Sequence, residues 1–236
     1  MIVELLVLGL FAGVLTTIAG MGGGLLLIVV LSALKGPHYA LAVTTPALLV
    51  ANLHRAYLFR REVNLTVAKA FALGAIPAAL LAGYFVPRLP ALVLQMVLIG
   101  ATLLTLARAL GLYTWKPSPR AITTGGAGIG ILTATAGGAG VLTGPLFLSA
   151  GLKGAAYIGT VAMGAVCLHF GRVLGYGLGG LFDATFMLPM TLLAVALVAG
   201  NVAGKGLRKK ISTKIESAVE MGALVVCTVV ALVGVG

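Results

Sequence analysis

Long runs of apolar residues, separated by short polar connections, dominate the chain. The uninterrupted runs 65–86 and 89–110 are each long enough to cross a bilayer, which takes about 20 residues of helix. Strand-like alternation of polar and apolar positions is missing, so the pattern predicts helices and not a membrane barrel. Apolar segments are expected at 2–34, 39–59, 65–86, 90–110, 121–151, 156–179, 184–204 and 217–236.

Two of these segments are too long for a single crossing. Segments 2–34 and 121–151 are each interrupted near the middle by a glycine cluster, at 20–24 and at 137–140. Glycine weakens a helix and, lacking Cβ, permits a sharp reversal of the chain at membrane depth. We therefore expect each long segment to enter the membrane, break at its glycines and return, as a re-entrant segment or a full hairpin.

The chain matches itself at an offset of 117 residues. The stretch LTTIAGMGGGL (15–25) aligns with LTATAGGAGVL (132–142), and Arg55 aligns with Arg172. Glycine-rich membrane sequence matches itself easily, but two aligned arginines inside apolar runs are harder to explain by composition. The pattern predicts two membrane repeats, 1–115 and 118–236, within one membrane domain.

Composition supports an integral membrane protein: 60% of residues are hydrophobic, 9% are charged, and the mean hydropathy is +1.15. The predicted fold is an all-α polytopic membrane protein of two repeats, each with a broken segment and three crossing helices. The net charge is +11. An excess of Lys and Arg is what the cytoplasmic loops of a membrane protein normally carry, so this charge does not indicate nucleic acid as a partner.

Charge also predicts the orientation. If each broken segment returns to its own side, twelve basic residues fall on one side and only Lys35 and Arg88 on the other. The positive-inside rule then places the basic loops in the cytoplasm and both termini outside. The two repeats are inverted in this arrangement, within the cell membrane. If each segment crossed once, the basic residues would be divided almost evenly.

Inverted repeats with broken helices are typical of secondary transporters. The amino ends of half-helices attract anions, and an arginine within the membrane is costly unless it lines a polar site. We therefore expect a site for a small anion where the two breaks meet. The candidate substrate-binding residues are Arg55, Arg172, Gly22, Gly23, Gly24, Gly138, Gly140, Asn52, His169, Thr17 and Thr135.

Alternatives stay open for several of these residues. Arg55 has the option of snorkelling to the surface beside Arg60 and Arg61. His169 is either a core histidine or a relay for a coupling proton. The threonines near the breaks, including Thr45, have the simpler role of satisfying freed backbone groups.

No known catalytic constellation is found in the sequence, so we do not expect an enzyme. Cys167 and Cys227 lack metal-like spacing and are best read as small core residues. Asp183 reads first as a helix cap and second as a coupling acid. No cofactor or metal is expected, whereas a homo-oligomer is compatible with the sequence.

The two glycine-broken stretches, GMGGGLLLIVVLSAL and GGAGVLTGPLFLSAG, each followed by a small-residue span and an arginine, resemble the sulfite exporter TauE/SafE family of membrane permeases. The resemblance covers the whole chain. It implies transport of sulfur-containing anions such as sulfite, sulfoacetate or other organosulfonates. The inverted repeats favour alternating access as the mechanism. An anion channel, or a permease for another small organic anion, is the alternative.

Overall fold

The computed structural model of the chain describes residues 2–19, 22–112, 118, 121–208 and 213–233. The regular structure in these residues consists of α-helices and short 3₁₀ turns, which confirms the all-α prediction. The helices are α1 (Ile2–Ala19), α2 (Gly23–Lys35), α3 (Pro37–Leu58), α4 (Leu65–Phe85), α5 (Ala91–Ala109), α6 (Ile122–Ala136), α7 (Ala139–Ser149), α8 (Gly154–Gly179), α9 (Met187–Arg208) and α10 (Thr213–Val233).

Four spans among the described residues are long and apolar enough to cross a membrane: Leu65–Arg88, Ala91–Arg108, Gly154–Gly179 and Ala184–Arg208. Large apolar side chains on their outer faces are exposed, for example Leu73 and Leu178. Exposed apolar surface of this extent is typical of a protein that is surrounded by lipid.

Both predicted breaks are present. Helix α1 ends at Ala19 and α2 begins at Gly23, while α6 ends at Ala136 and α7 begins at Ala139. Gly22 and Gly138, which precede α2 and α7, have φ angles of 94° and 68°. A residue with a Cβ is strained at such angles, so glycine is needed where the helix stops.

Helices that align with each other at the 117-residue offset make equivalent contacts in the two halves of the chain. Helix α1 packs along α9, and its counterpart α6 packs along α4. Helices α3 and α8, also counterparts, pack against each other in the middle of the bundle. The first helix of each half therefore packs on the fourth helix of the other half.

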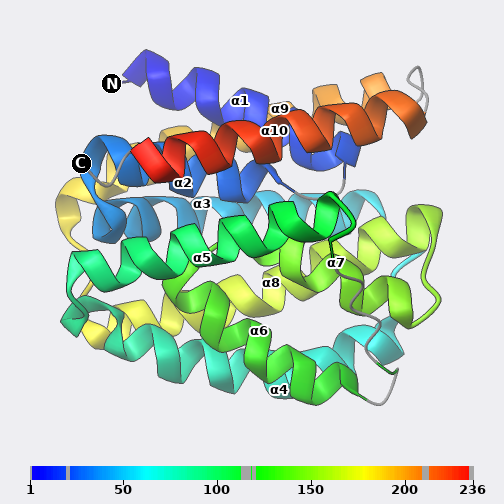
Figure 1. Cartoon of the computed structure of the whole chain (residues 1–236), viewed down its shortest axis with the longest axis horizontal. Coiled ribbons are helices and arrows are strands. Elements are labelled where there is room, and N and C mark those ends of the chain that lie inside the picture. Colours follow the sequence, from blue (N-terminus) through cyan, green and yellow to red (C-terminus); the bar gives the residue numbers. More distant parts are fainter. Residues whose placement is uncertain (1, 20–21, 113–117, 119–120, 209–212, 234–236) are drawn as a thin grey trace.

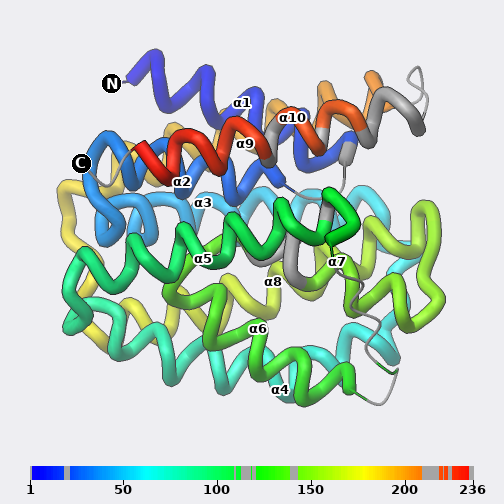
Figure 2. The backbone as a smooth tube through the Cα atoms, viewed as in Figure 1, coloured from blue at the N-terminus to red at the C-terminus, as the bar shows by residue number. Residues whose placement is uncertain are grey.

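Figures 1 and 2 show which connections share an end of the bundle. The N-terminal end of α1, the C-terminal end of α10 and the connections α2–α3, α4–α5 and α8–α9 lie at one end. The connections α3–α4 and α7–α8, the C-terminal end of α9 and the N-terminal end of α10 lie at the opposite end. Helices α4 and α9 consequently run in opposite directions, and so do α3 and α8.

Several helix pairs approach so closely that only glycine fits between them. A Cβ on Gly200 of α9 would lie 2.3 Å from the carbonyl oxygen of Leu10 in α1. A Cβ on Gly175 of α8 would lie 2.3 Å from the carbonyl oxygen of Leu80 in α4. Small residues at such contacts let membrane helices pack backbone to backbone.

Asp183 is a helix cap, as the sequence predicts first. Its Oδ1 accepts hydrogen bonds from the hydroxyl and the backbone N–H of Thr185, at 2.7 and 2.8 Å. These bonds, the hydroxyl's first, lower the pKa of this exposed carboxyl. Asp183 begins the 3₁₀ turn Ala184–Phe186, which leads into α9.

Candidate functional site

Arg55 is buried in the last turns of α3, with 2% of its surface exposed. Its Nη1 donates to the carbonyl oxygen of Thr16 at 3.1 Å, and its Nη2 donates to Oδ1 of Asn52 at 2.6 Å. Thr16 lies in the last turn of α1, where carbonyl groups lack partners within the helix and the helix dipole is negative. Arg55 therefore ties α3 to the carboxyl end of α1 and does not snorkel to the surface.

Arg172 of α8 is fully buried and makes a related but indirect connection. Its Nε donates to the hydroxyl of Tyr176 at 3.1 Å, and its Nη1 lies 3.3 Å from Nδ1 of His169. The Tyr176 hydroxyl donates in turn to the carbonyl oxygen of Ala134, in the last turn of α6. Each arginine is thus linked to the carboxyl end of a broken helix.

Two buried guanidinium atoms, Arg55 Nε of α3 and Arg172 Nη2 of α8, have no hydrogen-bond partner. Thr45 lies beside the Tyr176 hydroxyl, to which Arg172 also bonds. His169 lies within electrostatic reach of both guanidinium groups. The structure therefore brings Asn52, Arg55, His169 and Arg172 together between the two helices, and leaves donors unused there.

The two candidate hydroxyls have other partners. Thr17 is fully buried and donates to Oδ1 of Asn201 at 2.9 Å, while Nδ2 of Asn201 donates to the carbonyl oxygen of Ala51 at 2.8 Å. Thr135 donates to the carbonyl oxygen of Leu132 in its own helix at 3.0 Å. Thr135 therefore bonds to a backbone group, as the structural alternative expects, whereas Thr17 bonds to a side chain of α9.

The candidate glycines divide into two groups. Gly22 and Gly138 are the N-caps of α2 and α7, and neither helix start has a side-chain cap. Gly140 lies in the first turn of α7. Uncapped backbone N–H groups at a helix start attract anions, so these three positions remain candidates.

Gly23 serves packing, whereas packing does not require glycine at position 24. A Cβ on Gly23 would lie 2.1 Å from the carbonyl oxygen of Ala12 in α1. A Cβ on Gly24 would make an ordinary contact with the side chain of Leu48, at 3.4 Å. The close approach of α2 to α1 therefore explains Gly23 without a ligand, and Gly24 remains a candidate.

Tyr176 and Asn201 are missing from the candidates that the sequence indicates. The repeat alignment conceals Tyr176, because the position 117 residues earlier is Phe59, which has no hydroxyl. A signal was nevertheless present: Tyr176 follows Arg172 by four residues, so both lie on one face of the helix. Asn201 gives a weaker signal, as one asparagine in an apolar run.

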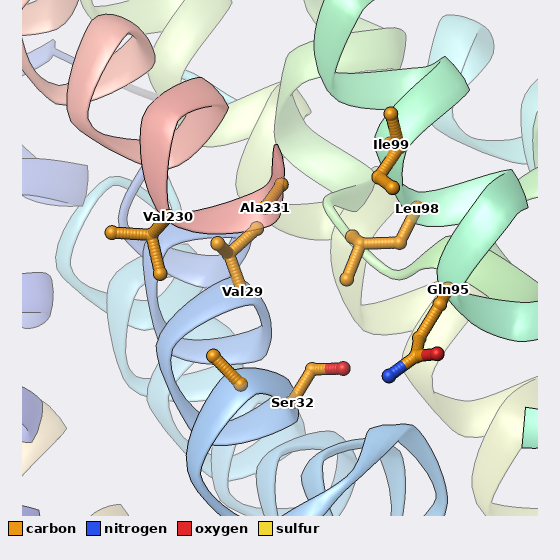
Figure 3. A pocket seen from close by; sticks show the side chains of 8 residues that line it. Val29, Ser32, Gln95, Leu98, Ile99, Val230 and Ala231 are labelled. Carbon is orange, nitrogen blue, oxygen red and sulfur yellow. The ribbon is translucent and has the colours of Figure 1, made fainter. Parts of the chain in front are cut away.

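Two other spaces are poor sites for an anion. The gap between α2, α5 and α10, where Ser32 and Gln95 point toward each other (Figure 3), offers about 10 Å³, which is near the minimum for one water. A groove of about 250 Å³ at the N-terminal end of the bundle is lined by Glu4, Lys35 and Tyr39. Its two charges have opposite sign, so it does not select anions.

Comparison with known proteins gives one match. A family model described as "Sulfite exporter TauE/SafE" matches residues 5–234, nearly the whole chain. Neither a curated protein nor a solved structure matches the chain.

Proposed function

Since the chain belongs to the sulfite exporter TauE/SafE family, we propose that it is a permease for a small sulfur-containing anion such as sulfite or an organosulfonate. The substrate binds between α3 and α8, beside the two helix breaks. Alternating access at the interface of two inverted repeats carries it across the cell membrane.

The observation that carries this proposal is the set of unpartnered donors between α3 and α8. A buried polar group without a partner costs about 1–3 kcal/mol, so Arg172 Nη2 is expected to bind something in the working protein. Thr45 supplies a further hydroxyl near this guanidinium, because both Thr45 and Nε of Arg172 contact the Tyr176 hydroxyl. A compact oxyanion that accepts from Nη2 satisfies the guanidinium.

Charge supports an anion over a neutral solute. The hydrogen bonds described for Arg55 and Arg172 end on neutral groups. An arginine at the centre of a membrane helix costs at least about 2.5 kcal/mol on insertion scales. A bound oxyanion offsets this cost, and a guanidinium group binds the oxygens of a sulfonate or sulfite well.

The directions of the helices support inverted repeats. Helix α4 runs opposite to its counterpart α9, and α3 runs opposite to α8, as inversion requires. We propose that the end of the bundle with the α3–α4, α7–α8 and α9–α10 connections faces the cytoplasm. Five of the 16 basic residues lie in the sequence of those connections, against one, Arg88, in the connections at the other end. The positive-inside rule retains basic loops in the cytoplasm.

Binding is tested on purified protein by thermal shift and calorimetry with sulfite, sulfate, sulfonates and carboxylates. Wild-type protein is expected to bind a sulfur oxyanion, and a ligand at 100 times its Kd stabilises by about 2.7 kcal/mol. Arg172→Gln should raise Kd roughly tenfold or more, because it removes a charge-assisted hydrogen bond. Arg61→Gln, the same change at an exposed turn, should leave Kd unchanged.

Transport is tested in proteoliposomes loaded with the anion that binds. A carrier gives saturable flux and counterflow, in which external substrate accelerates exit of labelled substrate. Single-channel currents would instead identify a pore. Equal affinity of wild type and Arg172→Gln for every anion would contradict the proposed site.

A further inference from the structure

The two arginines occupy equivalent positions in the repeats but are held differently. Both terminal nitrogens of Arg55 donate to the protein, to Thr16 and Asn52. Its unpartnered atom is Nε, which is next to the aliphatic stem and offers a single N–H. For Arg55 to present its terminal nitrogens to a substrate, it would have to release α1 or Asn52.

Arg172 has the opposite arrangement. Its Nε is held by the Tyr176 hydroxyl, its Nη1 faces His169, and its terminal Nη2 has no partner. Nη2 carries two N–H donors. Two contacts therefore fix the plane of the guanidinium while its outer nitrogen stays available, which is the geometry of a preorganised binding group.

The sequence cause of this difference is one residue. Position 176 is tyrosine, whereas the equivalent position 59 is phenylalanine. Tyr176 stands between Arg172 and the carboxyl end of α6 and accepts from Nε. Without that hydroxyl, Arg55 contacts the end of α1 directly and uses a terminal nitrogen to do so.

We propose that the two repeats have different roles in the site. Arg172 alone binds the anion, through Nη2, and Tyr176 positions that guanidinium. Arg55 positions the end of α1 without touching the substrate. This inference rests on the proposed function and narrows it. The symmetric site that the sequence suggests is replaced by a site in which the second repeat supplies the cation.

The experiment measures the Kd of sulfite, or of the sulfonate that binds best, for purified variants, together with their melting temperatures. Arg172→Lys keeps the charge but loses the planar fork, and its Kd should rise severalfold or more. Arg55→Lys keeps a charge and a donor for the carbonyl oxygen of Thr16, and its Kd should stay within about twofold of wild type although its Tm falls.

Tyr176→Phe makes the second repeat resemble the first at this position. We expect Kd to rise roughly three- to tenfold, the equivalent of one neutral hydrogen bond. Tyr84→Phe is the matched control, because Tyr84 also bonds to an arginine four residues away, Arg88, at an exposed position. The control should leave Kd unchanged.

The outcomes separate the two proposals. If Arg172→Gln binds as wild type does, the site itself is wrong. If Arg172→Gln loses binding and Arg55→Lys loses it equally, the site stands and the division of tasks is overturned. An unchanged Kd in Tyr176→Phe would overturn the positioning role of Tyr176.

Discussion

Asn201 is a single residue that joins three helices. From α9 it accepts a hydrogen bond from Thr17 of α1 and donates one to the carbonyl oxygen of Ala51 in α3. Ala51 directly precedes Asn52, the partner of Arg55. A side chain of α9 thus helps to fix the segment of α3 that carries the candidate site.

We predict a modest but measurable coupling between Thr17 and Asn201. Thr17→Val and Asn201→Leu should each destabilise the protein, because each leaves a buried partner unsatisfied. The double variant should be less destabilised than the sum, by about 0.6 kcal/mol and at most about 1.7 kcal/mol, the range for hydrogen bonds between membrane helices. Unfolding of the four proteins in mixed micelles with rising SDS measures this cycle. A coupling of zero would mean that the bond contributes nothing.

For single residues, the sequence predicts which polar side chains are buried better than it predicts their hydrogen-bond partners. Two arginines in apolar runs predict buried cations, because few other roles justify their cost. Their partners are the last-turn carbonyl oxygen of Thr16 and, through Tyr176, that of Ala134. Finding these partners requires knowing where α1 and α6 end in space, which no single-residue pattern encodes.

Glycine defines the contacts between elements. A Cβ on Gly171, Gly175 or Gly179 of α8 would lie 2.3 to 2.6 Å from a backbone oxygen of α4. Sequence composition shows that glycine is abundant, but not which helix each one faces. Only the register between helices separates packing glycines from open ones such as Gly128.

We predict that Gly175→Ala destabilises the protein by about 1–3 kcal/mol, the usual cost of overpacking. Its new Cβ would meet the backbone of Leu80, which cannot yield as a side chain can. Gly128→Ala in α6, where no atom lies within 4 Å, should be neutral or stabilising by up to about 1 kcal/mol, the gain in helix propensity. SDS unfolding of both variants makes the comparison, and equal stabilities would show that α8 and α4 can separate without cost.

The helix breaks make a second prediction at this scale. Gly138→Ala and Gly180→Ala both place a Cβ at positive φ, 68° and 83°, so each should be strained by about 1–2 kcal/mol. Gly138 begins α7, and its new Cβ would also lie 3.1 Å from the side chain of Leu25, whereas Gly180 is in open space. If the start of α7 belongs to the anion site, Gly138→Ala should weaken anion binding and Gly180→Ala should not. Equal binding by the two variants, measured by calorimetry, would remove the start of α7 from the site.

At the scale of elements, hydropathy and the glycine clusters predict the two helix breaks. A helix that is interrupted inside a membrane is interrupted most easily at residues without Cβ atoms. Pairing across the repeats, α1 with α9 and α6 with α4, is not predicted by those patterns. That pairing depends on how the two halves of the chain pack together in space.

At the scale of the molecule, the two ends of the bundle should be chemically distinct in cells. Arg88 lies between α4 and α5, at the end of the bundle that holds the start of α1 and the end of α10. Lys153 lies between α7 and α8, at the other end. Both side chains are exposed. In a background without native cysteines, Arg88→Cys should react with an impermeant maleimide on intact cells. Lys153→Cys should react only after permeabilisation. Labelling of both from outside would contradict the inverted arrangement.

The pairing of α1 with α9 has a consequence for biosynthesis. Met187, the first residue of α9, follows Ala19, the last of α1, by 168 residues. At about 5–20 residues per second, the ribosome needs roughly 8–34 s to make that stretch. Helix α6, in contrast, finds its partner α4 already made. We therefore expect the nascent chain to assemble α4 and α6 first. The face of α1 that carries Gly9 and Gly13, which contacts α9 in the folded protein, stays exposed to lipid until α9 leaves the translocon.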